Sequence, residues 1–190
     1  MRTHTLRLAV LLLLRFTPGL AADATVDSLL HQLKQVRDTS RVNVLNQLSF
    51  QFKGRDPVRS MTYARQAAAL SRQLDFPRGL AYAYNHIGAG HSNLNQYPEA
   101  ITWFTRALTL YRQLADTRGE QAALVNIGMV YHKQNNFPKA VEYYLLGLRL
   151  AEQRDDKVRT ANVLSHLGDV YSVQQDFPTA LSYYTRSLAL

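Results

Sequence analysis

The sequence predicts an all-α solenoid, in which antiparallel helix pairs stack into a right-handed superhelix. The main observation is internal repetition, because the pattern of residues 120–150 recurs 40 positions upstream and 40 positions downstream. Each copy contains two runs of apolar side chains at helical spacing, separated by a short polar break. Self-similarity at a fixed period is typical of solenoids, in which each unit buries its apolar face against the next one.

Small residues recur at the positions where two helices are expected to touch. Gly88, Gly128 and Gly168 each lie in the middle of an expected helix, where glycine costs about 1 kcal/mol relative to alanine. Since this cost recurs at one register, we expect a large side chain of the partner helix to enter beside each glycine. The expected partner helices carry large residues at Phe104, Tyr144 and Tyr184 and small residues at Ala100, Ala140 and Ala180.

Prolines and capping residues place the helix boundaries. Proline is tolerated in the first turn of a helix, where its missing N–H would have no partner, so Pro98, Pro138 and Pro178 mark the starts of second helices. In the irregular first repeat, Asp56-Pro57 marks a helix start and Asp38-Thr39-Ser40 is expected to cap the preceding helix. The regular repeats are expected to contain helices over residues 79–93, 97–114, 119–133, 137–153, 158–173 and 177–190.

Residues 1–24 have the order of an export signal. A basic start is followed by the apolar run Leu8–Leu14 and by small residues up to Ala24. The run is far shorter than the roughly 20 apolar residues of a membrane-spanning helix. We therefore expect a cleaved signal peptide and an exported, periplasmic or extracytoplasmic protein with no membrane span in this chain. The alternatives are an amphipathic or disordered tail and an uncleaved anchor.

The predicted organisation follows from these signals. The apolar stripe of residues 25–37 predicts a lone helix that covers the open end of the first repeat. The sequence ends on a second helix with no polar closing helix, so Leu181, Tyr184 and Leu188 are expected to have one uncovered flank. Either the chain is longer or a partner covers that end. The predicted segments are a signal peptide over 1–24, a capping helix over 25–37, a degenerate repeat over 38–77, and regular repeats over 78–117, 118–157 and 158–190.

Composition and motifs argue against catalysis. The 190 residues include no cysteine, which excludes disulfides, thiolate metal sites and a cysteine nucleophile. No HExxH motif, no serine nucleophile motif and no phosphate-binding loop occurs, and the six histidines are read as packed or exposed. The formal charge of +8 is spread along the chain, which favours a solvated surface over a nucleic-acid binding site. The sequence therefore predicts no enzyme, no cofactor and no metal.

The small and large residues described above resemble those of the tetratricopeptide repeat family, from about Arg41 to Leu190. The period of 40 in place of 34 resembles the longer-helix variety found in kinesin light chains and bacterial signalling proteins. An export signal followed by such an array is similar to the sensory region that precedes a membrane helix and a kinase or cyclase in some of those proteins. The resemblance implies a non-enzymatic protein- or peptide-binding scaffold. The alternatives are a module that self-assembles through its uncapped C-terminal face and, less favoured, a basic nucleic-acid binder.

The resemblance also implies where a ligand would bind. In this family the concave wall is built from first-helix residues that face away from the second helix. Asparagine offers both donors and an acceptor to an extended peptide backbone. The alternative is that these side chains are solvated or bond to the neighbouring helix. Only Lys53 and Lys133 are basic near this wall, so the grip on a terminal carboxylate that some members possess is not carried over. The candidate peptide-binding residues are Asn43, Asn46, Lys53, Tyr82, Asn85, Asn126, Met129, His132 and Asn162.

Overall fold

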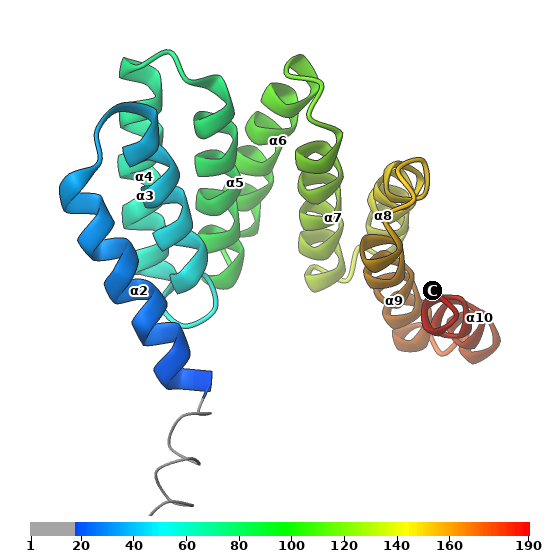
Figure 1. Ribbon diagram of the computed structural model, residues 1–190. Coiled ribbons are helices and arrows are strands. Elements are labelled where there is room, and N and C mark those ends of the chain that lie inside the picture. The colour runs from blue at the N-terminus through cyan, green and yellow to red at the C-terminus, as the bar shows by residue number, and fades with distance from the viewer. Residues whose placement is uncertain (1–17) are drawn as a thin grey trace, which may run out of the picture.

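The structure is a computed structural model that describes residues 18–190, and over these residues it consists of nine α-helices with no strand (Figure 1). Residues 1–17, which hold most of the predicted signal peptide, lie outside the described residues. None of the helices in this described part is long and apolar enough to cross a bilayer. The helices are α2 (Pro18–Gln35), α3 (Asp38–Phe52), α4 (Pro57–Gln73), α5 (Pro77–Asn93), α6 (Tyr97–Gln113), α7 (Thr117–Lys133), α8 (Phe137–Glu152), α9 (Lys157–Val173) and α10 (Phe177–Leu188).

The all-α prediction is confirmed, and the six helices expected in the regular repeats are present. Each observed boundary lies within two residues of the expected one. The first helices begin slightly early because Pro77 occupies the first turn of α5 and Asp116 caps α7 at its N-terminus. The lone N-terminal helix differs more, since α2 begins at Pro18 and ends at Gln35, two residues before residue 37.

Side-chain caps fix the starts of most helices. The carboxylate of Asp116 accepts a hydrogen bond from the backbone N–H of Gly119, and the equivalent Asp156 accepts from Arg159. The expected cap at Asp38-Thr39-Ser40 is wrong. The residue at the N-cap of α3 is Arg37, which makes no side-chain cap bond, and Asp38 adopts a φ of 53° in the turn that reverses the chain from α2 into α3.

The repeat period is visible in the backbone of the turns. From α4 onward, each connection between helices contains one residue in the left-handed region, and none of these residues is glycine. Such a residue ends a helix and turns the chain back on itself. They recur every 40 residues in two series, which are Asp75, Ala115 and Asp155 between repeats and Asn95, Asn135 and Gln175 within repeats.

The mid-helix glycines do accommodate large side chains of the partner helix. A Cβ added at Gly88 would lie 2.8 Å from the ring of Phe104, and one at Gly128 would lie 2.7 Å from the ring of Tyr144. The third glycine, Gly168, meets its partner tyrosine in the same way. Phe104 and Tyr144 are almost fully buried, so burying each ring contributes on the order of 1.5–3 kcal/mol. The packing expected from the sequence is therefore present.

The stacking of the helix pairs creates an inner and an outer wall (Figure 1). Besides packing against its own partner, each first helix contacts the first helices next to it, along the series α3, α5, α7 and α9. The second helices α4, α6, α8 and α10 make no such contacts with one another within residues 18–190. The wall with the closer spacing is the inner side of a curved stack, so first helices line the concave surface and second helices the convex one.

Candidate functional site

The concave surface holds a cavity of about 530 Å³, which we call the inner groove. All but one of its lining residues come from the end of α3, from α5, from α7 and from α9, and the exception is Tyr111 of α6. A volume of this size is typical of ligand sites, which span roughly 300–1,000 Å³. The groove therefore crosses all four repeats rather than belonging to one.

Five of the nine predicted site residues line the inner groove, and they are Lys53, Tyr82, Asn85, Asn126 and Asn162. Two more, Asn43 and Asn46, line a second cavity beside it. The remaining two line neither cavity. Met129 packs against the core formed by α8 and α9, and the ring of His132 lies 5.9 Å from that of Phe137, so both side chains are engaged in packing.

The asparagines of α5 and α7 form a connected polar pair on the floor of the groove. Asn126 Nδ2 donates a hydrogen bond of 3.0 Å to Asn85 Oδ1. This bond uses one group of each amide and leaves the Asn85 NH₂ and the Asn126 carbonyl oxygen able to pair with a ligand. One donor and one acceptor on neighbouring helices match the alternating donors and acceptors of an extended peptide backbone.

A second cavity of about 500 Å³ lies at the N-terminal end of the groove, and we call it the N-terminal pocket. It shares Phe50, Tyr82 and His86 with the inner groove, so the two cavities adjoin. The ring of Phe50 is 60% exposed and lies 6.3 Å from that of His86. The remaining lining residues are Thr25, Leu29, Asn43, Asn46, Gln47 and Gln51, contributed by α2 and α3.

The inner groove is more basic than the sequence indicated. Besides Lys53, the groove is lined by Arg118 and Arg159, whereas Asp169 is its only acidic lining residue. The expectation that only Lys53 and Lys133 are basic near this wall is therefore wrong. It failed because the two arginines lie in the first turns of α7 and α9, one helical turn before the positions considered.

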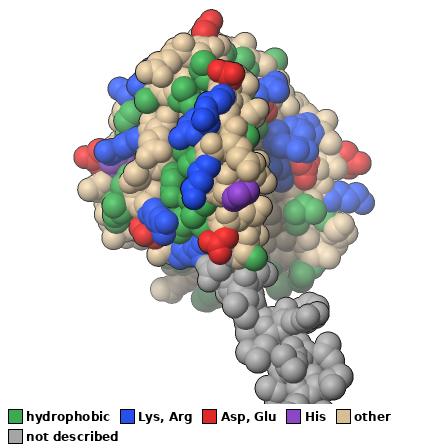
Figure 2. Space-filling view, turned by 60° about the vertical axis from the view of Figure 1, so that its left-hand side comes forward, with side chains coloured by type: hydrophobic (Ala, Val, Ile, Leu, Met, Phe, Trp, Pro, Cys, Tyr) green, Lys and Arg blue, Asp and Glu red, His purple; other side chains and the backbone are tan. Residues whose placement is uncertain are grey.

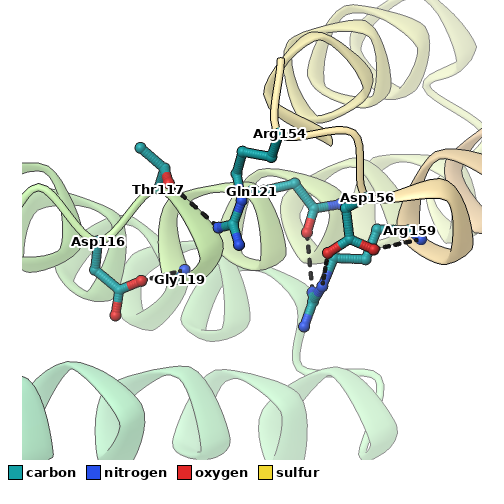
Figure 3. Close-up of polar contacts among 7 residues, drawn as sticks. All are labelled: Asp116, Thr117, Gly119, Gln121, Arg154, Asp156 and Arg159. Carbon is teal, nitrogen blue, oxygen red and sulfur yellow. Dashed lines mark hydrogen bonds and ion pairs between the residues drawn. The ribbon is translucent and has the colours of Figure 1, made fainter. Parts of the chain in front are cut away.

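The two arginines differ in how they are held. Arg159 donates a 3.0 Å hydrogen bond to the side-chain Oε1 of Gln121 on α7. It also lies 3.3 Å from Asp156, so it links two repeats in a fixed position (Figure 3). Arg118 forms no hydrogen bond or ion pair with any residue in the range 18–190. The positive charge of Arg118 is thus uncompensated on the wall of the groove.

Burial keeps two histidines of the groove uncharged. Desolvation, with a further contribution from the positive charge of Lys53, lowers the pKa of His86 to about 4. Desolvation also lowers the pKa of His166, although Asp169 opposes the shift. The ring of His166 stacks on Tyr144 at 5.4 Å. At neutral pH both rings are therefore uncharged, and each offers one hydrogen-bond donor and one acceptor.

Sequence reasoning missed His86, Arg118, Gln121, Arg159 and His166 as groove residues. The histidines were read as packed or exposed. Gln121 and Arg159 precede the inner positions that the helical register indicated. Helical spacing was the available signal, since Arg159, Asn162 and His166 fall at i, i+3 and i+7 and so share one face of α9.

Within residues 18–190 no metal site is evident, and the face seen in Figure 2 carries no dense basic patch. Residues 18–190 contain no group of three or more His, Cys, Asp or Glu side chains able to hold a metal ion. Figure 2 views the side that lies to the left in Figure 1 and shows Lys and Arg in several separate groups among hydrophobic and uncharged side chains. Nucleic-acid binding proteins typically concentrate such charges in a patch or stripe.

Solved structures with the same arrangement of helices come from several functional classes. A Rap protein complexed with competence and sporulation factor matches 90% of this chain and 49% of its own length, with a TM-score of 0.82 and 19% identity. Aspartyl phosphate phosphatase F from Bacillus subtilis matches over 84% and 42%, with a TM-score of 0.76 and 18% identity. A signal transduction ATPase with numerous domains from Pyrococcus horikoshii, which has a tetratricopeptide repeat sensor, matches over 95% and 28%, with a TM-score of 0.74 and 15% identity.

These likenesses establish the fold, and the chain spans less than half the length of each of these three proteins. No curated protein matches the chain significantly. Two tetratricopeptide repeat profiles match the sequence itself, one over residues 80–117 and the other over residues 119–190. With the paired helices, the recurrent glycines and the groove of first helices, these matches show that the chain belongs to the tetratricopeptide repeat family.

Proposed function

We propose that the protein is a non-enzymatic scaffold that holds an extended protein or peptide segment in its inner groove. The observation that carries the proposal is the hydrogen-bonded pair Asn85 and Asn126 on the groove floor, whose remaining amide groups point to no other partner within residues 18–190. Asn162 continues the polar row one repeat further along. Tetratricopeptide repeat proteins are generally scaffolds rather than catalysts, which agrees with this reading.

The proposal is tested by selection from a phage-displayed library of random dodecapeptides. Peptides recovered on the unmodified protein are then measured by fluorescence anisotropy against the double variant Asn126→Ala, Asn162→Ala. Each net hydrogen bond is worth about 0.5–1.5 kcal/mol, so we expect affinity to fall about tenfold. Gln66→Ala on the exposed surface of α4 is the matched control. No enrichment of any peptide, or equal affinity of the double variant, would refute binding in the groove.

We further propose that this scaffold is the exported sensory part of a larger bacterial signalling protein. The export-like order of residues 1–24 supports this placement. The similar ATPase from Pyrococcus horikoshii uses a tetratricopeptide repeat array as its sensor. Expression of the tagged chain in a bacterial host, followed by osmotic-shock fractionation and N-terminal sequencing, tests the idea. An intact N-terminus in the spheroplast fraction would contradict it.

A second candidate function is self-assembly through α10. Leu108 and Leu148 occupy equivalent places on α6 and α8 and are 6% and 5% exposed, whereas their counterpart Leu188 is 88% exposed. Leu181 is also exposed. The next first helix covers this face in the earlier repeats, so a second copy is proposed to cover it here. Light scattering at high concentration should then show a dimer that Leu188→Glu dissociates, and a monomer at all concentrations would eliminate the idea.

A further inference from the structure

The N-terminal pocket differs chemically from the groove that it adjoins. Its walls include Leu29, the exposed ring of Phe50 and the neutral imidazole of His86. No acidic or basic side chain lines it among residues 18–190. The surface of the pocket is mainly apolar, although amide side chains of α3 also line it. A concave cavity with a mainly apolar surface is the usual site for one large apolar group of a ligand.

One buried polar atom lies at this pocket without a partner. Asn46 is only 8% exposed, and its Nδ2 donates a 3.0 Å hydrogen bond to the carbonyl oxygen of Gly79. Because a carbonyl oxygen can only accept, the amide cannot be turned round, and Asn46 Oδ1 must face elsewhere. Oδ1 is buried and finds no hydrogen-bond donor among residues 18–190. A buried acceptor without a donor is unfavourable, so a small movement of Asn46 that opens Oδ1 to the pocket would let a ligand N–H satisfy it.

Two cations of the inner groove act on residues that it shares with the pocket. Lys53, one helical turn after Phe50, acts electrostatically on His86, and Arg118 on α7 acts on Tyr82. Neither side chain forms an ion pair with any residue in the described part of the chain. The single acidic residue of the groove, Asp169, lies at the opposite end on α9 and accepts a hydrogen bond from Tyr184. Asp116, which accepts a 3.5 Å hydrogen bond from Tyr82, adds one negative charge here, so Lys53 and Arg118 leave this end of the groove with a net positive charge that complements an anion.

We infer that the ligand is an acidic peptide segment with one large apolar side chain. This inference rests on the proposed function and specifies its ligand. The apolar side chain occupies the N-terminal pocket beside Phe50, and a small movement of Asn46 lets a backbone N–H of the same segment donate to its Oδ1. The acidic groups lie against Lys53 and Arg118. The apolar group thus fixes the register of the segment, and the charges select for acidic sequences.

Four fluorescein-labelled nonapeptides test the inference by anisotropy. The first has one central phenylalanine flanked by acidic residues, and the second replaces that phenylalanine with alanine. The third and fourth keep the phenylalanine but replace the acidic residues with glutamine and with lysine. We expect the first to bind tightest. Loss of the phenylalanine should weaken binding at least tenfold, because burying such a ring is worth about 1.5–3 kcal/mol. Loss of the charges should also weaken binding about tenfold, and added salt should reduce that difference.

Matched variants show which residues recognise the phenylalanine ring and which recognise the acidic groups. Gln47→Trp, at the exposed rim of the pocket, should fill the cavity and abolish the preference for phenylalanine over alanine, whereas Gln66→Trp on α4 should not. The double variant Lys53→Gln, Arg118→Gln should abolish the preference for acidic over neutral peptides, whereas Arg65→Gln on α4 should not. Far-ultraviolet circular dichroism and the unfolding midpoint establish that each variant is folded.

The possible outcomes separate the inference from the proposed function. Equal or tighter binding of the neutral or basic peptide refutes the acidic ligand, while sensitivity to Asn126→Ala would retain peptide binding in the groove. An affinity unaffected by Gln47→Trp refutes the apolar anchor. Absence of binding by the acidic phenylalanine peptide overturns the inference. Only if the random library also yields no binder does the scaffold proposal fail with it.

Discussion

Replacing Gly128 with alanine tests the packing on which the whole stack depends. The added methyl group would lie 2.7 Å from the ring of Tyr144 and 3.3 Å from the carbonyl oxygen of Ala140. The ring has little room to move, because Tyr144 is fully buried and stacks on His166. The neighbouring carbonyl belongs to the backbone of α8 and is equally constrained.

The expected magnitude follows from two opposing contributions. Overpacking a well-filled core costs about 1–3 kcal/mol, and contact with both a fixed ring and a backbone atom places Gly128→Ala at the upper end. Alanine recovers about 1 kcal/mol of helix propensity. The net loss of stability should be about 2 kcal/mol, which lowers the melting temperature of a chain of this size by roughly 4–8 °C.

Circular dichroism at 222 nm during urea and thermal unfolding measures this loss. Gly54→Ala is the matched control, because a Cβ at Gly54 meets nothing within 4 Å and the change should be neutral or slightly stabilising. In the double variant Gly128→Ala, Tyr144→Leu, the loss of stability should be smaller than the sum of the two single losses. The difference is the coupling energy, which should be about 0.5–3 kcal/mol. If Gly128→Ala is as stable as Gly54→Ala, the reasoning about small residues at helix contacts is wrong.

Three further changes probe strain, burial and protonation. Ala115 adopts a φ of 51°, so Ala115→Gly should stabilise the fold by about 0.5–1 kcal/mol in urea unfolding. The hydroxyl of Tyr144 is buried without a partner in the described residues, so Tyr144→Phe should stabilise by about 1 kcal/mol, whereas Tyr184→Phe, which loses a 2.7 Å bond to Asp169, should not. Because burial lowers the pKa of His86 from 6.5 to about 4, the unfolded chain binds more protons between these values. Stability should therefore be complete above pH 6.5 and fall by at most about 3 kcal/mol toward pH 4. His86→Gln should flatten that decrease, and an unchanged slope would contradict it.

The parts of the structure that the sequence predicts are those that repeat. Gly88, Gly128 and Gly168 each lower helix stability at the same position of the repeat, which is evidence that all three lie at a close contact between helices. Prolines in the first turn and aspartates at N-caps mark helix starts through local chemistry alone. The cap at Asp38 failed because that residue lies in the only turn that joins α2 to the array, where no other repeat provides a comparison.

The groove was harder to predict because its chemistry lies in departures from the repeat. Asn85, Asn126 and Asn162 lie on the expected inner faces of their helices, although their spacings of 41 and 36 residues depart from the 40-residue repeat. The partial burial of His86 depends on side chains from α3, far away in sequence. The unpaired acceptor of Asn46 likewise depends on the carbonyl of Gly79, a residue 33 positions further along the chain. No local pattern reports which of two amide atoms faces a neighbouring helix.

Arg159 shows how such a departure is accommodated without loss of packing. At the equivalent place one repeat earlier, Gly119 faces the ring of Tyr111, which leaves no room for any side chain. One repeat on, the pair becomes Ala151 and Arg159, because these positions lie 40 residues further along. The small alanine leaves space that the tyrosine fills in the earlier repeat, and the arginine side chain uses it to reach Gln121 and the groove. Ala151→Tyr should therefore displace Arg159 from Gln121 and lower the unfolding midpoint in urea, whereas the same change combined with Arg159→Gly should restore the packing of the earlier repeat.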